Sequence, residues 1–80
     1  MSTTVDNHPL LSRVTRIPGV RSGKPIIVGT RVTVWDILGW LAGGMSETEI
    51  LNDFPYLKKE DIQAAIIYTA QASKAVLGEA

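Results

Sequence analysis

The spacing of the apolar residues changes inside the segment 23–57. Residues 25–28 form a short β-branched run, which is typical of a strand, and the run ends at Gly29. Residues 31–34 alternate polar and apolar side chains, and residues 13–17 do so near their end, so both predict further strands. The strand at 25–28 can pair with either of these neighbours.

From Trp35 onward the spacing becomes helical. Apolar residues fall at i, i+3, i+4 and i+7, namely Val34, Ile37, Leu38 and Leu41. Thr33 is the expected N-cap, Asp36 completes a capping box, and residues 43–44 are glycines that end the helix. Because glycine costs about 1 kcal/mol relative to alanine inside a helix, Gly39 predicts that another backbone passes close by.

Two more helices follow in the sequence. Ser46 and Glu49 have the spacing of a second capping box, at the start of a helix of about residues 47–54. Pro55 ends that helix, because its ring cannot continue the hydrogen-bond ladder. The third helix begins near Lys59 and runs to about residue 77.

The third helix is apolar on more than one side. One stripe consists of Ile62, Ile66, Thr69, Ser73 and Val76, with Ala65 and Ala72 beside it. Such a helix is deeply buried or paired, and its alanines allow a second helix to approach, so self-association or a partner groove is favoured over a long helix with an exposed Ile67. Trp35 and Trp40 lie too far apart around their helix to share one stripe, so either one packs inward and the other lies at an edge or interface, or both cover a small core. The candidate interface residues are Trp40, Ile67, Tyr68 and Gln71.

These elements predict an α+β, mostly α fold. A short N-terminal β-hairpin or small sheet would precede a three-helix bundle of the winged or homeodomain-like helix-turn-helix type. Residues 1–12 are polar and largely unpatterned and are expected to be a flexible tail, with residues 13–80 forming a single domain. A chain of 80 residues buries only about 60% of its unfolded surface, and many such domains gain stability by pairing.

The net charge is zero, but the charges are segregated. Residues 1–31 carry five Lys or Arg against one Asp, a net +4, and residues 32–80 carry three lysines against seven acids, a net −4. The acids can be explained by helix N-termini, whose dipoles favour negative charge. The cations are not explained in this way. They form either a solvated basic rim or a surface for phosphate contacts, and the candidates for such contacts are Arg13, Arg16, Arg21, Lys24 and Arg31.

The sequence offers little for catalysis. It contains no cysteine, so a disulfide scaffold is excluded, and its single histidine, His8, lies in the expected tail beside Pro9, so neither a histidine-based metal site nor a Ser-His-Asp triad is expected within one chain. We therefore expect no enzymatic activity, no metal, no cofactor and no small-molecule substrate. No apolar run approaches the ~20 residues of a membrane span, and no secretory signal is visible, so a cytoplasmic location is expected.

The order of three helices also allows DNA binding. In a helix-turn-helix, the third helix would enter the major groove, with Lys58, Lys59 and Gln63 nearest the DNA. Glu60 and Asp61 at the same end would repel phosphates, so the arginine-rich hairpin is the stronger candidate for a backbone contact.

A set of short motifs carries a family resemblance over about residues 13–70. In chain order the motifs are Gly23-Lys24-Pro25, Gly29-Thr30-Arg31, Asp53-Phe54-Pro55 and Glu60-Asp61-Ile62. In this combination the chain resembles domain-of-unknown-function family 433. The resemblance implies a small winged or trihelical domain that acts as an antitoxin beside a toxin with a PIN-like nuclease fold. One departure is Lys58, which stands where the family often has a threonine or serine able to cap the third helix.

The leading hypothesis is therefore the antitoxin of a type II toxin–antitoxin pair. It would bind and block a PIN-like nuclease toxin and would bind its own promoter DNA as a homodimer. The alternatives are a stand-alone DNA-binding regulator and a pure protein-interaction module.

Overall fold

A computed structural model describes residues 8–77 of the chain, and the side chains of residues 8–72. Its elements in chain order are the 3-10 helix η1 (Pro9–Arg13), β1 (Val14–Thr15), the 3-10 turn η2 (Arg21–Gly23), β2 (Ile26–Ile27), α1 (Val34–Ala42), α2 (Glu47–Asp53) and α3 (Lys59–Leu77). The fold is α+β and mostly α, as the sequence predicts.

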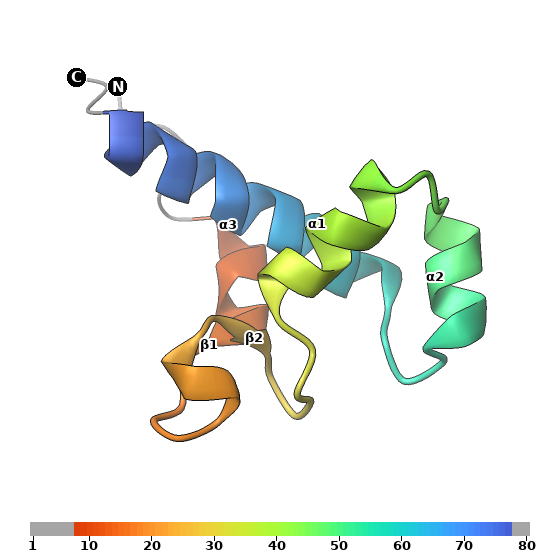
Figure 1. Cartoon of the computed structure of the whole chain (residues 1–80), viewed down its shortest axis with the longest axis horizontal. Coiled ribbons are helices and arrows are strands. Elements are labelled where there is room, and N and C mark those ends of the chain that lie inside the picture. The colour runs from red at the N-terminus through yellow and green to blue at the C-terminus, as the bar shows by residue number, and fades with distance from the viewer. Residues whose placement is uncertain (1–7, 78–80) are drawn as a thin grey trace.

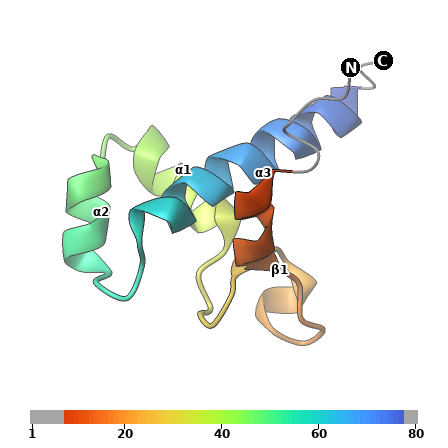
Figure 2. The same ribbon diagram turned by 180° about the vertical axis from the view of Figure 1, so that it is seen from behind.

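The long helix α3 is the element on which the others pack. The helices η1 and α1 make the most extensive contacts with it, and α2 and β1 add smaller ones. In Figures 1 and 2, η1 and α1 cross α3 near its middle, while α2 stands apart from the strands at the far end of the molecule. The core between them is made of Ile27, Val32, Val34, Ile37, Ile50, Leu57, Ile62 and Ala65. Complete burial of each large aliphatic side chain contributes roughly 1.5–3 kcal/mol.

The sheet has two antiparallel strands, and it settles the pairing that the sequence leaves open. Val14 lies opposite Ile27 in β1 and β2, so the strand at 25–28 pairs with the first strand. The strand predicted at residues 31–34 is wrong, because that segment makes only one isolated bridge, between Ile26 and Thr33. The pairing does not extend beyond this bridge, because Pro25 has no N–H to donate and Val32 N–H donates to the Thr30 hydroxyl at 3.0 Å.

The structured part of the chain begins before the predicted boundary. Residues 9–12, predicted as part of a flexible tail, form η1 with Arg13 and pack on α3. Pro9 opens this 3-10 helix with its preset φ, and Nδ1 of His8 accepts a hydrogen bond from Leu10 N–H at 3.1 Å. The first strand is correspondingly shorter than the predicted 13–17. The rest of the predicted tail, residues 1–7, lies outside the described residues.

Both predicted capping boxes are present. Thr33 Oγ1 accepts from Asp36 N–H at 2.9 Å, and Ser46 Oγ accepts from Glu49 N–H at 3.1 Å, while each carboxylate accepts from the backbone of its cap residue. The glycines at 43–44 end α1, with Gly44 at a φ of +103° that L-residues rarely adopt. These two helices begin and end close to where the sequence predicts.

The start of α3 uses a different device. Lys58 cannot cap with its side chain, but its backbone N–H donates to Asp61 Oδ2 at 2.9 Å. Arg13 Nη1 donates to the other carboxylate oxygen at 2.9 Å, and Asp61 is buried. The N-terminus of α3 is thus held by the carboxylate of Asp61 in its first turn and by Arg13 of η1. Asp61 is therefore not a surface charge that would repel phosphates.

Two details of the helices differ from the prediction. A Cβ atom added at Gly39 would meet open space, so no backbone passes close to it. On α3, Ile66 is exposed and Ile67 is half-buried, the reverse of the predicted stripe, because Ala64 and Ala65 are the residues buried there. The side chains predicted at the end of that stripe, Ser73 and Val76, lie outside the described ones.

Candidate functional site

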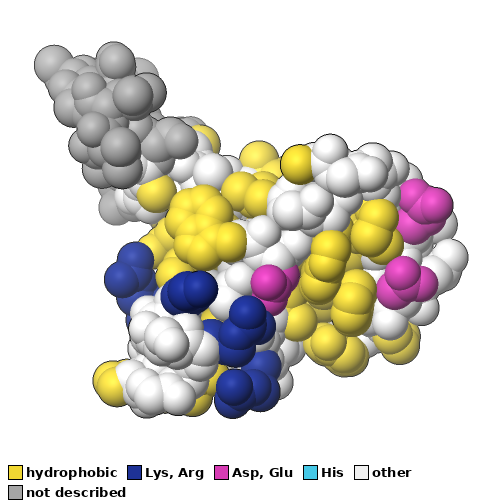
Figure 3. Space-filling view, in the orientation of Figure 1, with side chains coloured by type: hydrophobic (Ala, Val, Ile, Leu, Met, Phe, Trp, Pro, Cys, Tyr) yellow, Lys and Arg dark blue, Asp and Glu magenta, His cyan; other side chains and the backbone are white. Residues whose placement is uncertain are grey.

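The segregation of charge along the sequence persists in the folded molecule. In Figure 3, Lys and Arg side chains gather over the N-terminal lobe (residues 14–33, with β1, η2 and β2), and acidic side chains lie over α2 at the opposite end. Most of the predicted phosphate-binding arginines, however, have partners inside the chain. Arg13 bonds to Asp61, and Arg16 Nη2 donates to the hydroxyl of Tyr68 at 2.9 Å.

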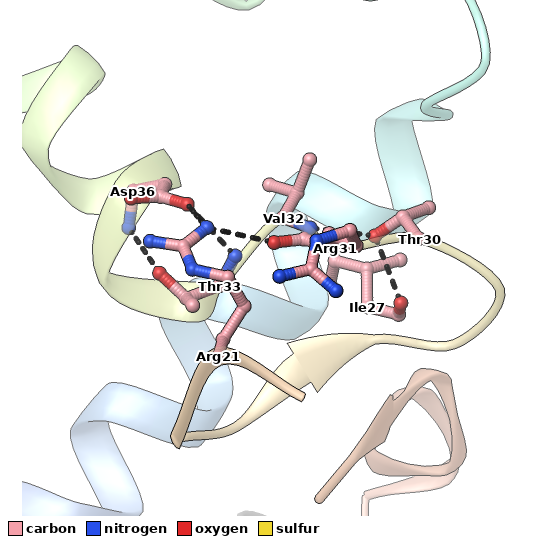
Figure 4. A network of polar contacts seen from close by, with 7 residues as sticks. All are labelled: Arg21, Ile27, Thr30, Arg31, Val32, Thr33 and Asp36. Carbon is pink, nitrogen blue, oxygen red and sulfur yellow. Dashed lines mark hydrogen bonds and ion pairs between the residues drawn. The ribbon is translucent and has the colours of Figure 1, made fainter. Parts of the chain in front are cut away.

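Arg21 is the centre of a polar network, drawn in Figure 4. Its Nη1 donates to the backbone carbonyl of Arg31 at 2.8 Å and to Asp36 Oδ2 at 3.0 Å. Burial raises the pKa of Asp36, but the hydrogen bonds from Thr33 and Arg21 outweigh it and hold the pKa of this carboxyl below its ordinary value. Arg21 therefore ties η2 to the loop before α1 and to the first turn of α1.

The same network shapes the loop of residues 28–32. Thr30 Oγ1 donates to the Ile27 carbonyl at 2.9 Å and accepts from Val32 N–H at 3.0 Å. Gly29 takes a φ of +82°, which a residue with a side chain rarely adopts. With its backbone held by Arg21, Arg31 presents an exposed guanidinium that bonds to no group within the described part of the chain.

An open groove of about 650 Å³ lies beside this loop. Its walls and floor are mainly apolar and include Ile17, Val20, Ile26, Thr30, Arg31 and Tyr56. Ile26 is fully buried and forms the floor, whereas Ile17 and Tyr56 are among the most exposed large apolar side chains of the molecule. We refer to this feature as the Arg31 groove. It brings together residues from before β2, after β2 and after α2.

The tyrosine of the groove is supported from the core. Trp40 stacks on Phe54 with ring centroids 4.3 Å apart, and Phe54 contacts Tyr56 edge-on at 6.3 Å. Trp40, predicted at an interface, is half-buried and packs against the core, and the more exposed tryptophan is Trp35. Aromatic pairs of this kind contribute about 0.5–1.5 kcal/mol beyond burial, so they restrict where Tyr56 can lie.

The other predicted site residues do not join this groove. Lys58 and Lys59 are exposed, and Gln63 is half-buried in a smaller pocket of about 400 Å³ with His8, Leu10, Ile66 and Ile67. Tyr68, predicted at an interface, packs partly against the core, and Gln71 is half-buried. Lys24 is exposed on the N-terminal lobe. Of the predicted cations, Arg31 lines the Arg31 groove, and the smaller pocket contains none of them.

The arrangement is suited to binding. Within residues 8–72, no cluster of acidic or histidine side chains is placed to hold a metal ion. None of the described helices combines the length and the hydrophobicity that crossing a bilayer requires. Sequence reasoning missed Ile17, Val20 and Tyr56 as site residues. A signal for Tyr56 is available, since it follows Pro55 in a turn where no helical stripe requires an aromatic side chain.

A family model and a solved structure point to the same family. The model of the family described as "Protein of unknown function (DUF433)" matches residues 14–69. An uncharacterised protein of Sinorhizobium fredii, y4eO, is 40% identical over 55 residues, which are 69% of this chain and 25% of that relative, so this chain spans about a quarter of the relative's length. A crystal structure of a DUF433 member protein from Anabaena variabilis matches with a TM-score of 0.74 and 26% identity, over 99% of this chain and 84% of that one.

Proposed function

The chain belongs to the DUF433 family, and from this premise we propose that it is a non-catalytic, cytoplasmic antitoxin that neutralises a PIN-like nuclease toxin by direct binding. The observation that carries the proposal is an excess of exposed apolar surface. Among the side chains of residues 8–72, five large apolar ones are exposed by between 44% (Ile17) and 59% (Tyr56), the others being Val28, Trp35 and Ile66.

Exposed apolar side chains are ordinary when scattered and informative when they gather. Ile17 and Tyr56 line one groove, although 38 residues separate them in sequence. Apolar patches rimmed by polar groups are typical of sites for protein partners. The motif Gly29-Thr30-Arg31 lines this groove, and the motif Asp53-Phe54-Pro55 directly precedes its Tyr56 in the sequence, so the family resemblance and the exposed surface concern the same part of the molecule.

The polar side chains support a binding role in a different way. Asp36, Asp61, Arg13 and Arg21 are used in hydrogen bonds that hold the elements together. In the described part of the chain, every buried side-chain nitrogen or oxygen has a hydrogen-bond partner. Such a frame is typical of a rigid scaffold that presents a surface, and rigid scaffolds lose little conformational entropy on binding.

Co-expression with the product of the neighbouring reading frame tests the proposal. We expect the neighbour to arrest growth when it is expressed alone, and this chain to restore growth and to co-purify with it. A neighbour that is harmless alone, or a toxic one that this chain neither binds nor relieves, contradicts the antitoxin role.

DNA binding is a second candidate function, favoured by four exposed cations that bond to no described group: Lys24, Arg31, Lys58 and Lys59. If they contact phosphates, the logarithm of the association constant for promoter DNA falls with the logarithm of salt by about 0.9 per contact. A Lys58→Ala, Lys59→Ala variant then has a shallower slope. The DNA-binding function would require a homodimer. The mass of the protein with and without DNA, measured by sedimentation, tests whether this dimer forms.

A further inference from the structure

We propose that the Arg31 groove is the surface that holds the nuclease, and that it takes a segment in which a carboxylate stands beside a large apolar side chain. This inference rests on the proposed function and adds the site and the chemistry of the partner segment.

The apolar residues of the groove indicate that the partner segment carries a large apolar side chain. Ile17 and Tyr56 stand exposed on its walls, and Ile26 closes its floor. Its volume of about 650 Å³ falls among those of ligand pockets, which are about 300–1,000 Å³. An apolar side chain placed there would remove the exposed faces of Ile17 and Tyr56 from water.

The charged residue of the groove indicates that the partner segment also carries a carboxylate. Arg31 is the one charged residue among those that line the groove, and its guanidinium has no bond to any described residue. Arginine forms paired, charge-assisted hydrogen bonds with carboxylates and phosphates. The outer surface of duplex DNA offers phosphates but no apolar group to cover Ile17 and Tyr56, so a protein segment with a carboxylate satisfies the whole groove and a duplex satisfies only Arg31.

A second copy of this chain is a poorer occupant. Its exposed carboxylates include Glu49 and Asp53 on α2, which would complement Arg31. None of the exposed large apolar side chains of the described residues lies on α2. Tyr56, the one nearest in sequence to Asp53 and to the exposed Glu60, already lines the groove of its own copy, so neither carboxylate brings a separate apolar anchor to place between Ile17 and Tyr56.

The loop that presents Arg31 is held in place before any partner arrives. Arg21 bonds to the Arg31 carbonyl, and Thr30 bridges the Ile27 carbonyl and Val32 N–H. Arg21 is thus a positioning residue for Arg31. A preorganised loop keeps more of its interaction energy as affinity, because less is lost in ordering it on binding.

The experiment measures affinity for the purified product of the neighbouring reading frame by calorimetry, using pairs of matched variants. Arg31→Glu is paired with Lys59→Glu, since both reverse an exposed free cation. Ile17→Ser is paired with Ile66→Ser, since these isoleucines are 44% and 46% exposed. Thermal melts of the four variants verify that each is folded.

We expect each groove variant to weaken binding by about tenfold or more and each control by less than about threefold, the usual contrast between hot spots and peripheral residues. The Arg21→Lys variant, which can still form one bond, should weaken binding by less than Arg31→Glu. Raising the salt concentration should weaken the wild type more than Arg31→Ala, because the ion pair is screened.

Three outcomes overturn the inference. If the wild type binds the nuclease and the groove variants bind equally well, the groove is wrong while the antitoxin role stands. If the groove variants lose self-association or the binding of a 20-base-pair promoter duplex but keep nuclease affinity, the occupant is a second copy or DNA. If the wild type does not bind the nuclease, the proposed function fails and the inference fails with it.

Discussion

Asp36 at the start of α1 and Asp61 at the start of α3 make the same pair of contacts in different surroundings. Each accepts from the backbone N–H three residues earlier and from an arginine of the N-terminal half of the chain. The Asp61 side chain is 7% exposed and that of Asp36 is 32% exposed. The carboxylate of Asp61 divides the two donors between its oxygens, whereas Oδ2 of Asp36 accepts both.

The difference shows how one local pattern serves two purposes. At α3, no side chain caps the helix from position 58, so Asp61 and Arg13 hold the helix start and join it to η1. At α1, Thr33 already caps the helix, and Arg21 uses Asp36 as one of two anchors while its other bond holds the loop of Arg31. The buried contact therefore stabilises the fold, and the partly exposed one positions a candidate binding residue.

Of the substitutions that test this difference between the two aspartates, Asp61→Ala should have the largest effect on stability. It removes a cap and a charge-assisted hydrogen bond and leaves Lys58 N–H and Arg13 without their acceptor, which should lower the free energy of unfolding by about 3 kcal/mol. Urea denaturation measures this loss. Asp61→Asn keeps an oxygen for Lys58 N–H and should lose less. If the two substitutions cost the same small amount, the contact with Arg13 does not hold α3.

Asp36→Ala should have a smaller effect on stability and a larger one on binding. Loss of half a capping box and of a partly exposed ion pair should lower the free energy of unfolding by about 1–1.5 kcal/mol. Because Arg21 loses one of its anchors, affinity for the nuclease should also fall. The matched control is Glu49→Ala, which breaks the corresponding box of α2 far from the groove, and a Glu49→Ala variant with equally weak binding contradicts the positioning role.

The substitution Lys58→Thr should make the capping of α3 resemble that of α1. A threonine here can accept from the Asp61 N–H and complete the capping box that α1 already has, which should stabilise the protein by about 0.5–1 kcal/mol. The midpoint of urea unfolding should rise without a change in the slope. The gain should disappear in the Asp61→Ala background, where the reciprocal carboxylate is missing.

Lowering the pH should reveal a modest contribution of the ionised Asp36 carboxylate to stability. A carboxyl whose pKa is lower in the folded state adds stability that is complete above its unfolded pKa of about 3.9 and is lost as the pH falls through the folded pKa. The wild type should therefore lose stability below about pH 4 more steeply than Asp36→Asn. Equal slopes would show that the bonds from Thr33 and Arg21 do not favour the charged form.

Much of the fold follows from local patterns in the sequence. Thr33 with Asp36 and Ser46 with Glu49 predict the starts of α1 and α2, and the glycines at 43–44 predict the end of α1, because capping and glycine geometry act within one turn of chain. The predicted strand at 31–34 failed because Val32 N–H donates to the Thr30 hydroxyl and Pro25 has no N–H, so the pairing stops at one bridge. That competition depends on which hydrogen bonds the packed structure permits.

The candidate site is less predictable than the fold. Five cations of the N-terminal part look alike in sequence, yet Arg13, Arg16 and Arg21 bond within the chain, and Arg31 lines the groove. Their partners lie 52, 48 and 15 residues away, for Arg16, Arg13 and Arg21 respectively, so no local spacing distinguishes the roles. The contact of Tyr56 and Ile17 with the same groove is equally hidden in the sequence, because these two residues are far apart along the chain.

The amino-acid sequence is enough to predict the three helices, the caps of α1 and α2, the mostly α class, the family and the segregation of charge, because each depends on neighbours in the chain or on the identities of the residues. Only the tertiary structure decided which carboxylate is buried, which tryptophan packs inward and which arginine is left free. Burial and the pairing of distant charges arise when α3 packs against η1 and α1, and that packing brings together groups that the linear order keeps apart.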